Sequence, residues 1–397
     1  MTPALRFLSA AITTASPDEA SGSLFIAGVF LNGGKPRLTP SAAAFDETRG
    51  GALTRMIECG AFDAKAGSTL FLGETEAFPN GFAVLGLGEE KDFSRKVFAE
   101  CAAKAARAFA WAESQAYAVQ EWLPPKTSGK SSARLFSTAV LNALTPRFTL
   151  KTEHDDGIRT KRIFWIDDLV TDKLVQGLDE GVVTAEAMSI SRGLADLPGN
   201  VCTPAYLAEA VQNAAAGMTT VEVEVLDEHQ IEELGMGAFL SVAKGSTVPP
   251  RFIAIRYRGT NAALPPVAFV GKGITFDTGG ISLKPAANMA DMTYDMSGAA
   301  VVIGTVMAAA RAKLPVNLLG VVAACENLPS GSAAKPGDVV TSLSGKTIEI
   351  LNTDCEGRMI LADALTWTAR QKPELIIDAA TLTGACCVAL GAPYSGL

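Results

Sequence analysis

Histidine is nearly absent from this sequence. Its 397 residues contain only His154 and His229, which lie in unrelated contexts. An HExxH zinc site needs two histidines one helical turn apart, and a Cys/His zinc finger needs histidines that follow paired cysteines, so both are excluded. A Ser-His-Asp triad would have to use one of these two histidines, and no GxSxG motif marks a nucleophilic serine. Any catalysis must therefore rely on carboxylates, lysines and arginines.

Signals for export, membranes and disulfides are also missing. The seven cysteines form no CxxC pair, and no apolar run approaches the length of a membrane span. Residues 1–16 lack the charged start and long apolar stretch of a signal peptide. These absences predict a cytoplasmic protein with reduced thiols and no membrane contact.

Positive charge is in deficit. The 34 Lys and Arg residues are outnumbered by 42 Asp and Glu residues, which gives a formal net charge of −8. Because phosphate binding requires a basic surface, nucleic acid is an unexpected partner. A hydrophobic content of 48% with only 19% charged residues is typical of a folded, core-rich enzyme.

The length and the apolar pattern predict two α/β domains joined by a helix. The first domain covers residues 1–165, a linking helix lies within residues 166–195, and the second domain covers residues 196–397. In the first domain we expect strands at 24–30, 70–72, 82–87 and 163–165, and helices at 98–117 and 133–143.

The second domain has the clearer alternation of strands and helices. Residues 172–195 predict one long helix before it, and Thr203 and Pro204 are typical of a helix start. We expect strands at 221–226, 252–257, 267–270, 317–323, 347–351 and 375–378, and helices at 229–234, 297–312 and 359–370. This order predicts a mixed, mostly parallel sheet flanked by helices.

Charged side chains gather where the expected strands end, which is where α/β folds place their sites. They are Lys272, Asp277, Lys284, Asp295, Asp354, Glu356 and Arg358. In an extended segment Asp354, Glu356 and Arg358 would point to one side. Four carboxylates at one edge of a sheet need compensation, and oxygen ligands suit Mg²⁺, Mn²⁺ or Zn²⁺. The pattern therefore indicates a site for two divalent cations.

Each of these features also has an ordinary structural interpretation. Asp295 directly before a helix is typical of an N-cap, and the Asp354-Cys355-Glu356 segment could be a solvated turn. Lys272 and Lys284 could be surface lysines. The glycine-rich segment at 271–280 could be a bare turn or a phosphate loop, although no GxxxxGK[ST] motif is present.

The same segments resemble the leucyl aminopeptidase family. NTDCEGRM at 352–359 is similar to the family signature NTDAEGRL, with Cys355 in place of Ala and Met359 in place of Leu. VGKGITFDTGGISLKP at 270–285, DMSGAA at 295–300 and TLTGA at 381–385 match further family blocks. The resemblance extends from about residue 184 to the end of the chain and is weak in the first domain.

The resemblance implies a fold, an activity and an assembly. The first domain would be macrodomain-like and the second phosphorylase/hydrolase-like. The activity would be release of N-terminal amino acids from peptides, preferably leucine and other apolar residues, by a two-metal bridging-hydroxide mechanism with Mn²⁺, Zn²⁺ or Mg²⁺. The assembly would be a homohexamer, a dimer of trimers.

Site roles also follow from the resemblance. One metal would be held by Asp277, Asp354 and Glu356, and the other by Lys272, Asp277, Asp295 and Glu356. Lys284 would stabilise the oxyanion, and Arg358 would hold a bicarbonate ion that acts as general base. The substrate-binding set would be Lys272, Asp277, Lys284, Met292, Asn352, Thr381 and Gly384.

Three other expectations stay open. Family members continue past the point where this sequence stops, so we expect residues 1–397 alone to fold poorly or to lack full activity. An inactive member with a DNA-binding or scaffold role is an alternative, although every expected ligand residue is present. A two-metal phosphoesterase is disfavoured because histidine ligands and a phosphate cradle are missing.

Overall fold

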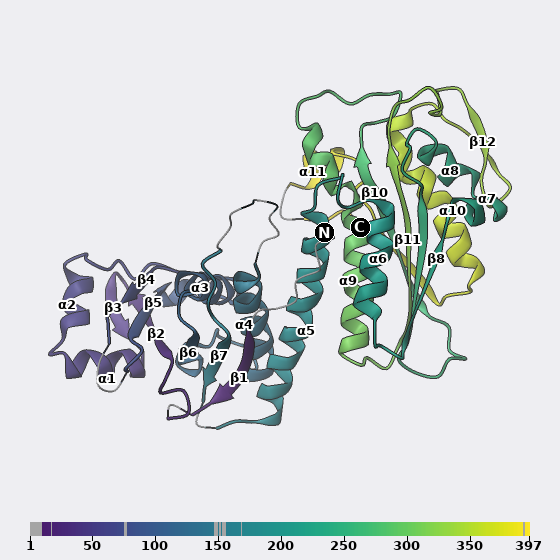
Figure 1. Cartoon of the computed structure of the whole chain (residues 1–397). Helices are drawn as coiled ribbons and strands as arrows, with labels where there is room; N and C mark the ends of the chain where they lie inside the picture. The colour runs from purple at the N-terminus through teal and green to yellow at the C-terminus, as the bar shows by residue number, and fades with distance from the viewer. Residues whose placement is uncertain are drawn as a thin grey trace. The chain divides into compact units, whose positions relative to one another are not determined.

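The computed structural model describes residues 10–16, 18–74, 78–146, 150, 152, 156–167, 169–391 and 394–397. The chain divides into two compact units between Ser189 and Ile190 (Figure 1). This division falls within α5 (Asp172–Ala195), which is the single long helix expected at those residues. All seven cysteines are free.

The first unit contains one twisted sheet. Its strand order is β1-β7-β6-β2-β5-β4, with β3 paired to β2. The pairs along β1-β7-β6-β2-β5 are parallel, whereas β3 and β4 pair antiparallel with their neighbours. The strands are β1 (Ala11–Ala15), β2 (Leu24–Asn32), β3 (Lys35–Leu38), β4 (Thr69–Phe71), β5 (Phe82–Glu89), β6 (Ser114–Tyr117) and β7 (Arg162–Ile166).

Helices cover both faces of this sheet because its central strands are apolar on both sides. Leu24 and Ile26 of β2 belong to a core with α3 and α4, whereas the alternate residues Phe25 and Ala27 belong to a second core with α1 and α2. The helices are α1 (Pro40–Thr48), α2 (Ala52–Glu58), α3 (Arg95–Ala108) and α4 (Gly129–Leu144), with short 3₁₀ turns η1 (Glu90–Asp92) and η2 (Val119–Trp122).

The expected helix at 98–117 is wrong at its end. Helix α3 stops at Ala108, and Ser114–Tyr117 forms β6 between β2 and β7. The Gln115 side-chain amide donates to the backbone carbonyls of Ala106 and Phe109. These carbonyls lie at the end of the helix, where no further helical N–H is available to bond to them. The alanine-rich segment has a helical pattern over its whole length, but pairing with β2 and β7 makes its last four residues a strand.

The second unit contains a mixed sheet in the order β14-β10-β11-β9-β8. The pairs β14-β10 and β10-β11 are parallel, and the pairs β11-β9 and β9-β8 are antiparallel. The expected mixed α/β sheet is therefore confirmed. Its strands are β8 (Val221–Leu226), β9 (Arg251–Arg258), β10 (Val267–Asp277), β11 (Asn317–Asn327) and β14 (Leu375–Ala379).

Two helical layers enclose this sheet (Figure 1). Helices α6 (Pro204–Ala215) and α9 (Ser297–Arg311) pack on one face, and α8 (Gly237–Ala243) and α10 (Glu356–Arg370) pack on the other. Helices α7 (Glu228–Glu233) and α11 (Ala385–Leu390) are peripheral. As predicted, Thr203 caps α6, since its side chain accepts the backbone N–H of Tyr206.

Two details around the signature segment differ from expectation. The strand expected at 347–351 does not join the main sheet, because β13 (Thr347–Glu349) pairs antiparallel with β12 (Val339–Thr341) in a separate hairpin. The following helix does not begin at residue 359. Instead, η4 (Thr353–Cys355) leads directly into α10 at Glu356.

Within the described residues, one helical segment is long and apolar enough to cross a membrane. It combines η3 (Met289–Met296) with α9 and runs over Met289–Arg311, but 61% of its apolar window is buried inside the protein. Helix α9 packs on β10 and β11, so this apolar character is that of a core helix.

Candidate metal centre

Charged side chains converge at the ends of β10 and β11. Lys272 lies within β10, Asp277 ends it, and Asp295 lies in η3 beside it. Asp354 comes from η4, and Glu356 is the first residue of α10. Carboxylate oxygens of Asp277, Asp354 and Glu356 lie within 4.8 Å of one another. Three segments distant in the sequence thus form one acidic cluster.

Lys272 lies at the centre of one half of the cluster and is only 2% exposed. Its Nζ lies 2.8 Å from Asp295 Oδ2 and 2.7 Å from Glu356 Oε1, and it donates to the Thr381 carbonyl at 2.5 Å. Burial opposes the charge, but Asp295 and Glu356 outweigh burial and raise the pKa of Lys272. The alternative of a surface lysine is therefore wrong.

Lys284 has the corresponding place in the other half. Its Nζ lies 2.8 Å from Asp277 Oδ2 and also pairs with Asp354. Partial burial disfavours the charge, but hydrogen bonds to both carboxylates raise the pKa of Lys284 above its ordinary value. The side chains of Lys284 and Asp354 are 21% and 33% exposed, so this half faces solvent.

Asp295 is not a helix cap. Met296 occupies the N-cap of α9, and no side chain caps the helix there. Asp295 Oδ1 instead accepts the Thr381 hydroxyl at 2.7 Å. Burial raises the pKa of Asp295 to about 7, although Lys272 and Thr381 act in the opposite direction. Lys272 and Thr381 therefore do not fully offset the cost of burying a negative charge on Asp295.

The cluster has the properties of a divalent-cation site. Four carboxylates face two ammonium groups, so an excess of negative charge is held in a largely buried place. Glu356 Oε2 is buried, and no donor in the described part of the chain bonds to it. Oxygen donors with uncompensated charge suit Mg²⁺, Mn²⁺ or Zn²⁺, so these residues fit the group that the sequence pattern indicates.

Most of the expected site residues belong to this cluster. Hydrogen bonds and ion pairs join Lys272 to Asp295, Glu356 and Thr381, and ion pairs join Lys284 to Asp277 and Asp354. The two groups meet where carboxylate oxygens of Asp277, Asp354 and Glu356 approach one another. Asn352 supports it, because its Oδ1 accepts the Asp354 backbone N–H at 2.8 Å. Among the described residues, no hydrogen bond or ion pair links Met292, Arg358 or Gly384 to the cluster.

The expected alternation over 354–358 is wrong. The segment is a 3₁₀ turn followed by a helix, so side chains do not alternate as in a strand. Asp354 and Glu356 still converge because the turn brings them together. Arg358 lies two residues beyond Glu356 in the helix, roughly 200° around its axis. Glu356 is accordingly buried and Arg358 exposed.

The sequence analysis missed Asn327. This residue ends β11 beside Asp277, is 4% exposed, and donates from Nδ2 to Asp277 Oδ1 at 2.8 Å. The signal that could have found it is its position, since it ends a strand whose residues 318–325 are apolar, at the edge where Asp277 ends β10.

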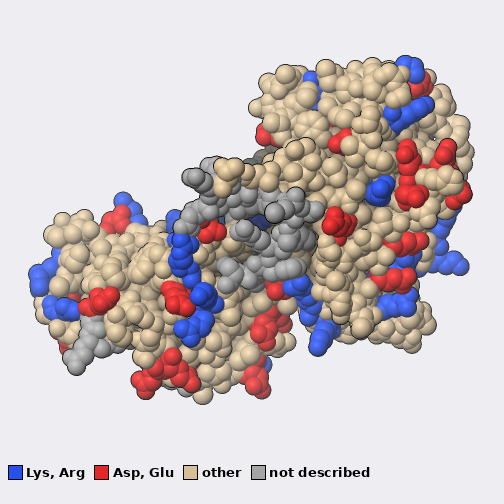
Figure 2. Space-filling model, viewed as in Figure 1, with Lys and Arg blue, Asp and Glu red and all other residues tan. Residues whose placement is uncertain are grey.

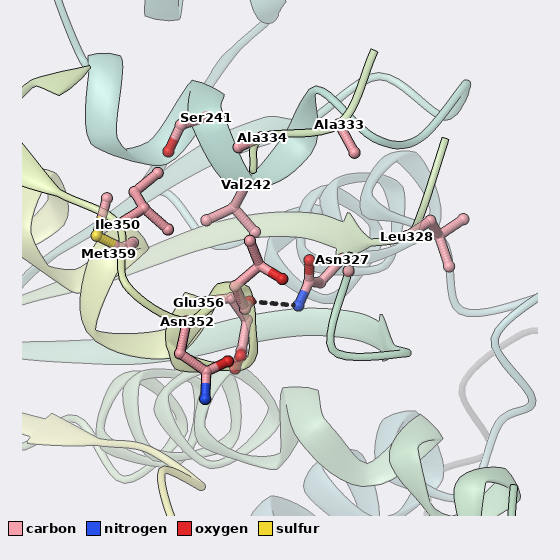
Figure 3. A pocket seen from close by; sticks show the side chains of 12 residues that line it. Ser241, Val242, Asn327, Leu328, Ala333, Ala334, Ile350, Asn352, Glu356 and Met359 are labelled. Atoms are coloured by element: carbon pink, nitrogen blue, oxygen red, sulfur yellow. Dashed lines mark hydrogen bonds between the residues drawn. The ribbon is translucent and has the colours of Figure 1, made fainter. Parts of the chain in front are cut away.

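A small pocket lies beside the cluster (Figure 3). Its cavity of about 20 Å³ has room for about one water molecule. Glu356, Asn352 and Asn327 line it together with the apolar side chains Ile350 and Met359. It is too small for a peptide side chain, so a large ligand would reach the carboxylates from the exposed side of Lys284 and Asp354.

Gly357 gives a first testable prediction. A Cβ at this position would lie 2.7 Å from Leu382 Cδ2 and 2.9 Å from Lys272 Cδ. Because the added methyl group would overlap the buried stem of Lys272, Gly357→Ala should push this side chain aside and displace its Nζ from Asp295 and Glu356. We expect cation affinity, measured by calorimetry, to fall by roughly 10-fold. Gly331→Ala is the control, because nothing lies within 4 Å of its Cβ. Equal affinities in the two variants would contradict the prediction.

Comparison with known families agrees with this geometry. The model of the cytosol aminopeptidase family catalytic domain matches residues 189–397, and that of the family's N-terminal domain matches residues 26–151. The catalytic-domain match begins within one residue of the division between the compact units, and the N-terminal-domain match lies wholly in the first unit.

Curated relatives match over most of the chain. A probable cytosol aminopeptidase of Azoarcus sp. (strain BH72) is 44% identical over 97% of this chain and 78% of its own length. One from Bordetella pertussis is also 44% identical with the same coverage, and one from Paraburkholderia phymatum is 45% identical over 91% of this chain and 72% of its own length.

Solved structures show the same fold. A mutant of tomato leucine aminopeptidase aligns with a TM-score of 0.82 at 30% identity, over 98% of this chain and 77% of that chain. The bottromycin maturation enzyme BotP in complex with Mn aligns with a TM-score of 0.77 at 28% identity, over 93% and 74%. With both family domains, the relatives and these structures in agreement, this chain belongs to the cytosol aminopeptidase family.

Proposed function

We propose that this peptidase is a metallo-aminopeptidase that uses two divalent cations to release N-terminal amino acids, preferably leucine and other apolar residues. The observation that carries the proposal is the acidic cluster itself, in which Glu356 Oε2 is buried without a donor among the described residues. A peptidase without a described histidine near its carboxylates needs another means of activating water, and metal ions supply it.

The ligand sets follow the two halves of the cluster. Asp277, Asp354 and Glu356 would hold one cation, and Lys272, Asp277, Asp295 and Glu356 the other. When bound, the cations supply Lewis-acid activation of the scissile carbonyl and of water. Lys272 would serve as a ligand only in its neutral form, although in the metal-free site its carboxylate neighbours favour the charged form. The structurally similar enzyme BotP forms a complex with Mn, which favours Mn²⁺ among the candidate metals.

Other residues would act on the substrate directly. Lys284 has an ammonium group that is partly exposed at the open side of the cluster, so it can donate to an oxygen on which negative charge develops. Arg358 is an exposed guanidinium that could bind bicarbonate with two parallel hydrogen bonds, and this anion would carry the proton. Met292, Asn352, Thr381 and Gly384 would contact the bound peptide.

The proposed setting is cytoplasmic, with peptides as partners and a homohexamer as the assembly. The relatives' name, cytosol aminopeptidase, supports the location. We do not include nucleic acid among the partners, because the net charge is −8 and basic and acidic groups are interspersed on the face in Figure 2. An inactive scaffold is less well supported, since all five proposed ligand residues are in place.

Removal of metal tests the proposal. We expect the chelator-treated chain to hydrolyse leucine amide at the background rate, because the carboxylates and lysines alone offer no activated water. Adding back Mn²⁺, Zn²⁺ or Mg²⁺ separately should restore turnover with at least one of them. Dipeptides blocked at the N-terminus serve as the control and should remain intact. Absence of activity with every metal would contradict the enzymatic proposal.

A further inference from the structure

Asn327 connects two segments that carry carboxylates. It is the last residue of β11, and its side-chain amide is buried. Nδ2 donates one hydrogen bond to Asp277 Oδ1 at 2.8 Å and another to the Thr353 carbonyl at 3.1 Å. Both amide hydrogens are therefore used, one on each segment. Asp277 Oδ2 remains directed to Lys284.

Thr353 makes a second connection between the same segments. Its hydroxyl donates to the Gly279 carbonyl at 2.6 Å and accepts the Ser282 backbone N–H at 2.8 Å. The Thr353 backbone N–H in turn donates to the Ser282 hydroxyl at 3.2 Å. Thr353 directly precedes Asp354, so these bonds fix the turn from which the Asp354 carboxylate projects.

The packing around Asn327 leaves little space for a side chain in the loop after β10. A Cβ on Gly280 would lie 2.8 Å from Asn327 Oδ1 and 3.0 Å from Thr353 Oγ1, and Gly280 also has a positive φ of 67°. Only glycine fits easily under these conditions. The loop after β10 therefore lies directly against both Asn327 and Thr353.

We propose that Asn327 is a positioning residue that sets the separation of Asp277 and Asp354 for cation binding. The inference rests on the proposed metallo-aminopeptidase function. Lys284 pairs with both Asp277 and Asp354 and offsets their repulsion, but its ammonium group is on a long, partly exposed side chain, so a buried contact is needed to fix the distance between the two carboxylates. A neutral amide that donates to one carboxylate and to the backbone of the other segment does this without competing as a charged ligand.

A purely structural role is the alternative, and the same strand offers a matched control. Asn317 is the first residue of β11 and is 7% exposed. Its Nδ2 also makes two hydrogen bonds, to the carbonyls of Asn261 at 2.8 Å and Leu264 at 3.1 Å. Asn317→Ala therefore removes a similar buried amide at the opposite end of β11.

The test compares Asn327→Ala with Asn317→Ala in the full chain. Mn²⁺ affinity is measured by calorimetry on the metal-free proteins, and folding by circular dichroism and Tm. We expect Asn327→Ala to bind Mn²⁺ roughly 10- to 100-fold more weakly, the range for loss of a group that orients a metal ligand. Asn317→Ala should keep the wild-type affinity even if its Tm falls equally.

Hydrolysis of leucine amide gives a second readout. Asn327→Ala should need a higher Mn²⁺ concentration for half-maximal activity and should recover most of its kcat at saturating Mn²⁺. If Asn327→Ala does not fold, Ser282→Ala decides, since it removes the bond to the Thr353 N–H at a less buried position. We expect this variant to weaken Mn²⁺ binding by several-fold.

The outcomes separate this inference from the proposed function. A wild-type chain that neither binds Mn²⁺ nor hydrolyses leucine amide contradicts the proposed function. If the wild-type chain does both and folded Asn327→Ala keeps the wild-type Mn²⁺ affinity, only the positioning role is overturned. Where Asn327→Ala does not fold, unchanged Mn²⁺ affinity in Ser282→Ala has the same meaning. Equal losses of affinity in Asn327→Ala and Asn317→Ala also overturn it, because they would reflect general destabilisation.

Discussion

Substitution of Glu356 by glutamine is expected to lower kcat/KM for leucine amide by more than about 100-fold, which exceeds the usual loss for a residue that only supports a metal ligand. Glu356 belongs to both proposed ligand sets. Its Oε1 lies 2.7 Å from Lys272 Nζ, and its buried Oε2 has no donor among the described residues. Glutamine keeps the shape and can still accept from Lys272, but its amide nitrogen cannot bind a cation.

The cause of this loss can be identified by calorimetry. Glu356→Gln should bind Mn²⁺ much more weakly than the wild type, while its circular dichroism spectrum stays unchanged because α10 is retained. Glu349→Gln, at an exposed position in the β12–β13 hairpin, is the matched control and should behave as wild type. If Glu356→Gln retains wild-type Mn²⁺ affinity, Glu356 is not a ligand.

Substitution of Lys284 by methionine should have an equally large effect on the rate, but for another reason. We expect kcat to fall by roughly 100- to 1000-fold, as when one donor to a developing oxyanion is removed. KM should change little, because Lys284 would interact mainly with charge that exists only in the transition state. Methionine has a similar length and apolar stem and lacks the ammonium group.

Metal binding distinguishes Lys284→Met from Glu356→Gln. Lys284 Nζ lies 2.8 Å from Asp277 Oδ2 and also pairs with Asp354, so its removal leaves those carboxylates more negative. Mn²⁺ affinity should therefore stay equal or increase in Lys284→Met, whereas it falls in Glu356→Gln. Lys346→Met, at an exposed turn, is the control. A Lys284→Met variant that keeps more than about a tenth of the wild-type kcat would exclude the oxyanion role.

The sequence alone determined the local features of this protein. Thr203 followed by Pro204 predicted the start of α6, and the uninterrupted pattern over 172–195 predicted α5. Such signals depend on neighbouring residues and need no tertiary context. The scarcity of histidine and the carboxylates at strand ends likewise predicted an oxygen-ligand metal site, because chemistry limits which side chains can hold cations.

Only the tertiary structure decided how distant segments meet. Ser114–Tyr117 became a strand because β2 and β7 flank it, and Thr347–Glu349 paired with β12 instead of joining the main sheet. Glu356 and Arg358 diverged because the segment is a helix and not a strand. Asn327 was not recognisable in the sequence, since an amide has no distinctive spacing and its role comes from contacts with Asp277 and Thr353. Thus residue chemistry determined which groups could hold a metal, and the packing of β10, β11 and α10 determined their geometry.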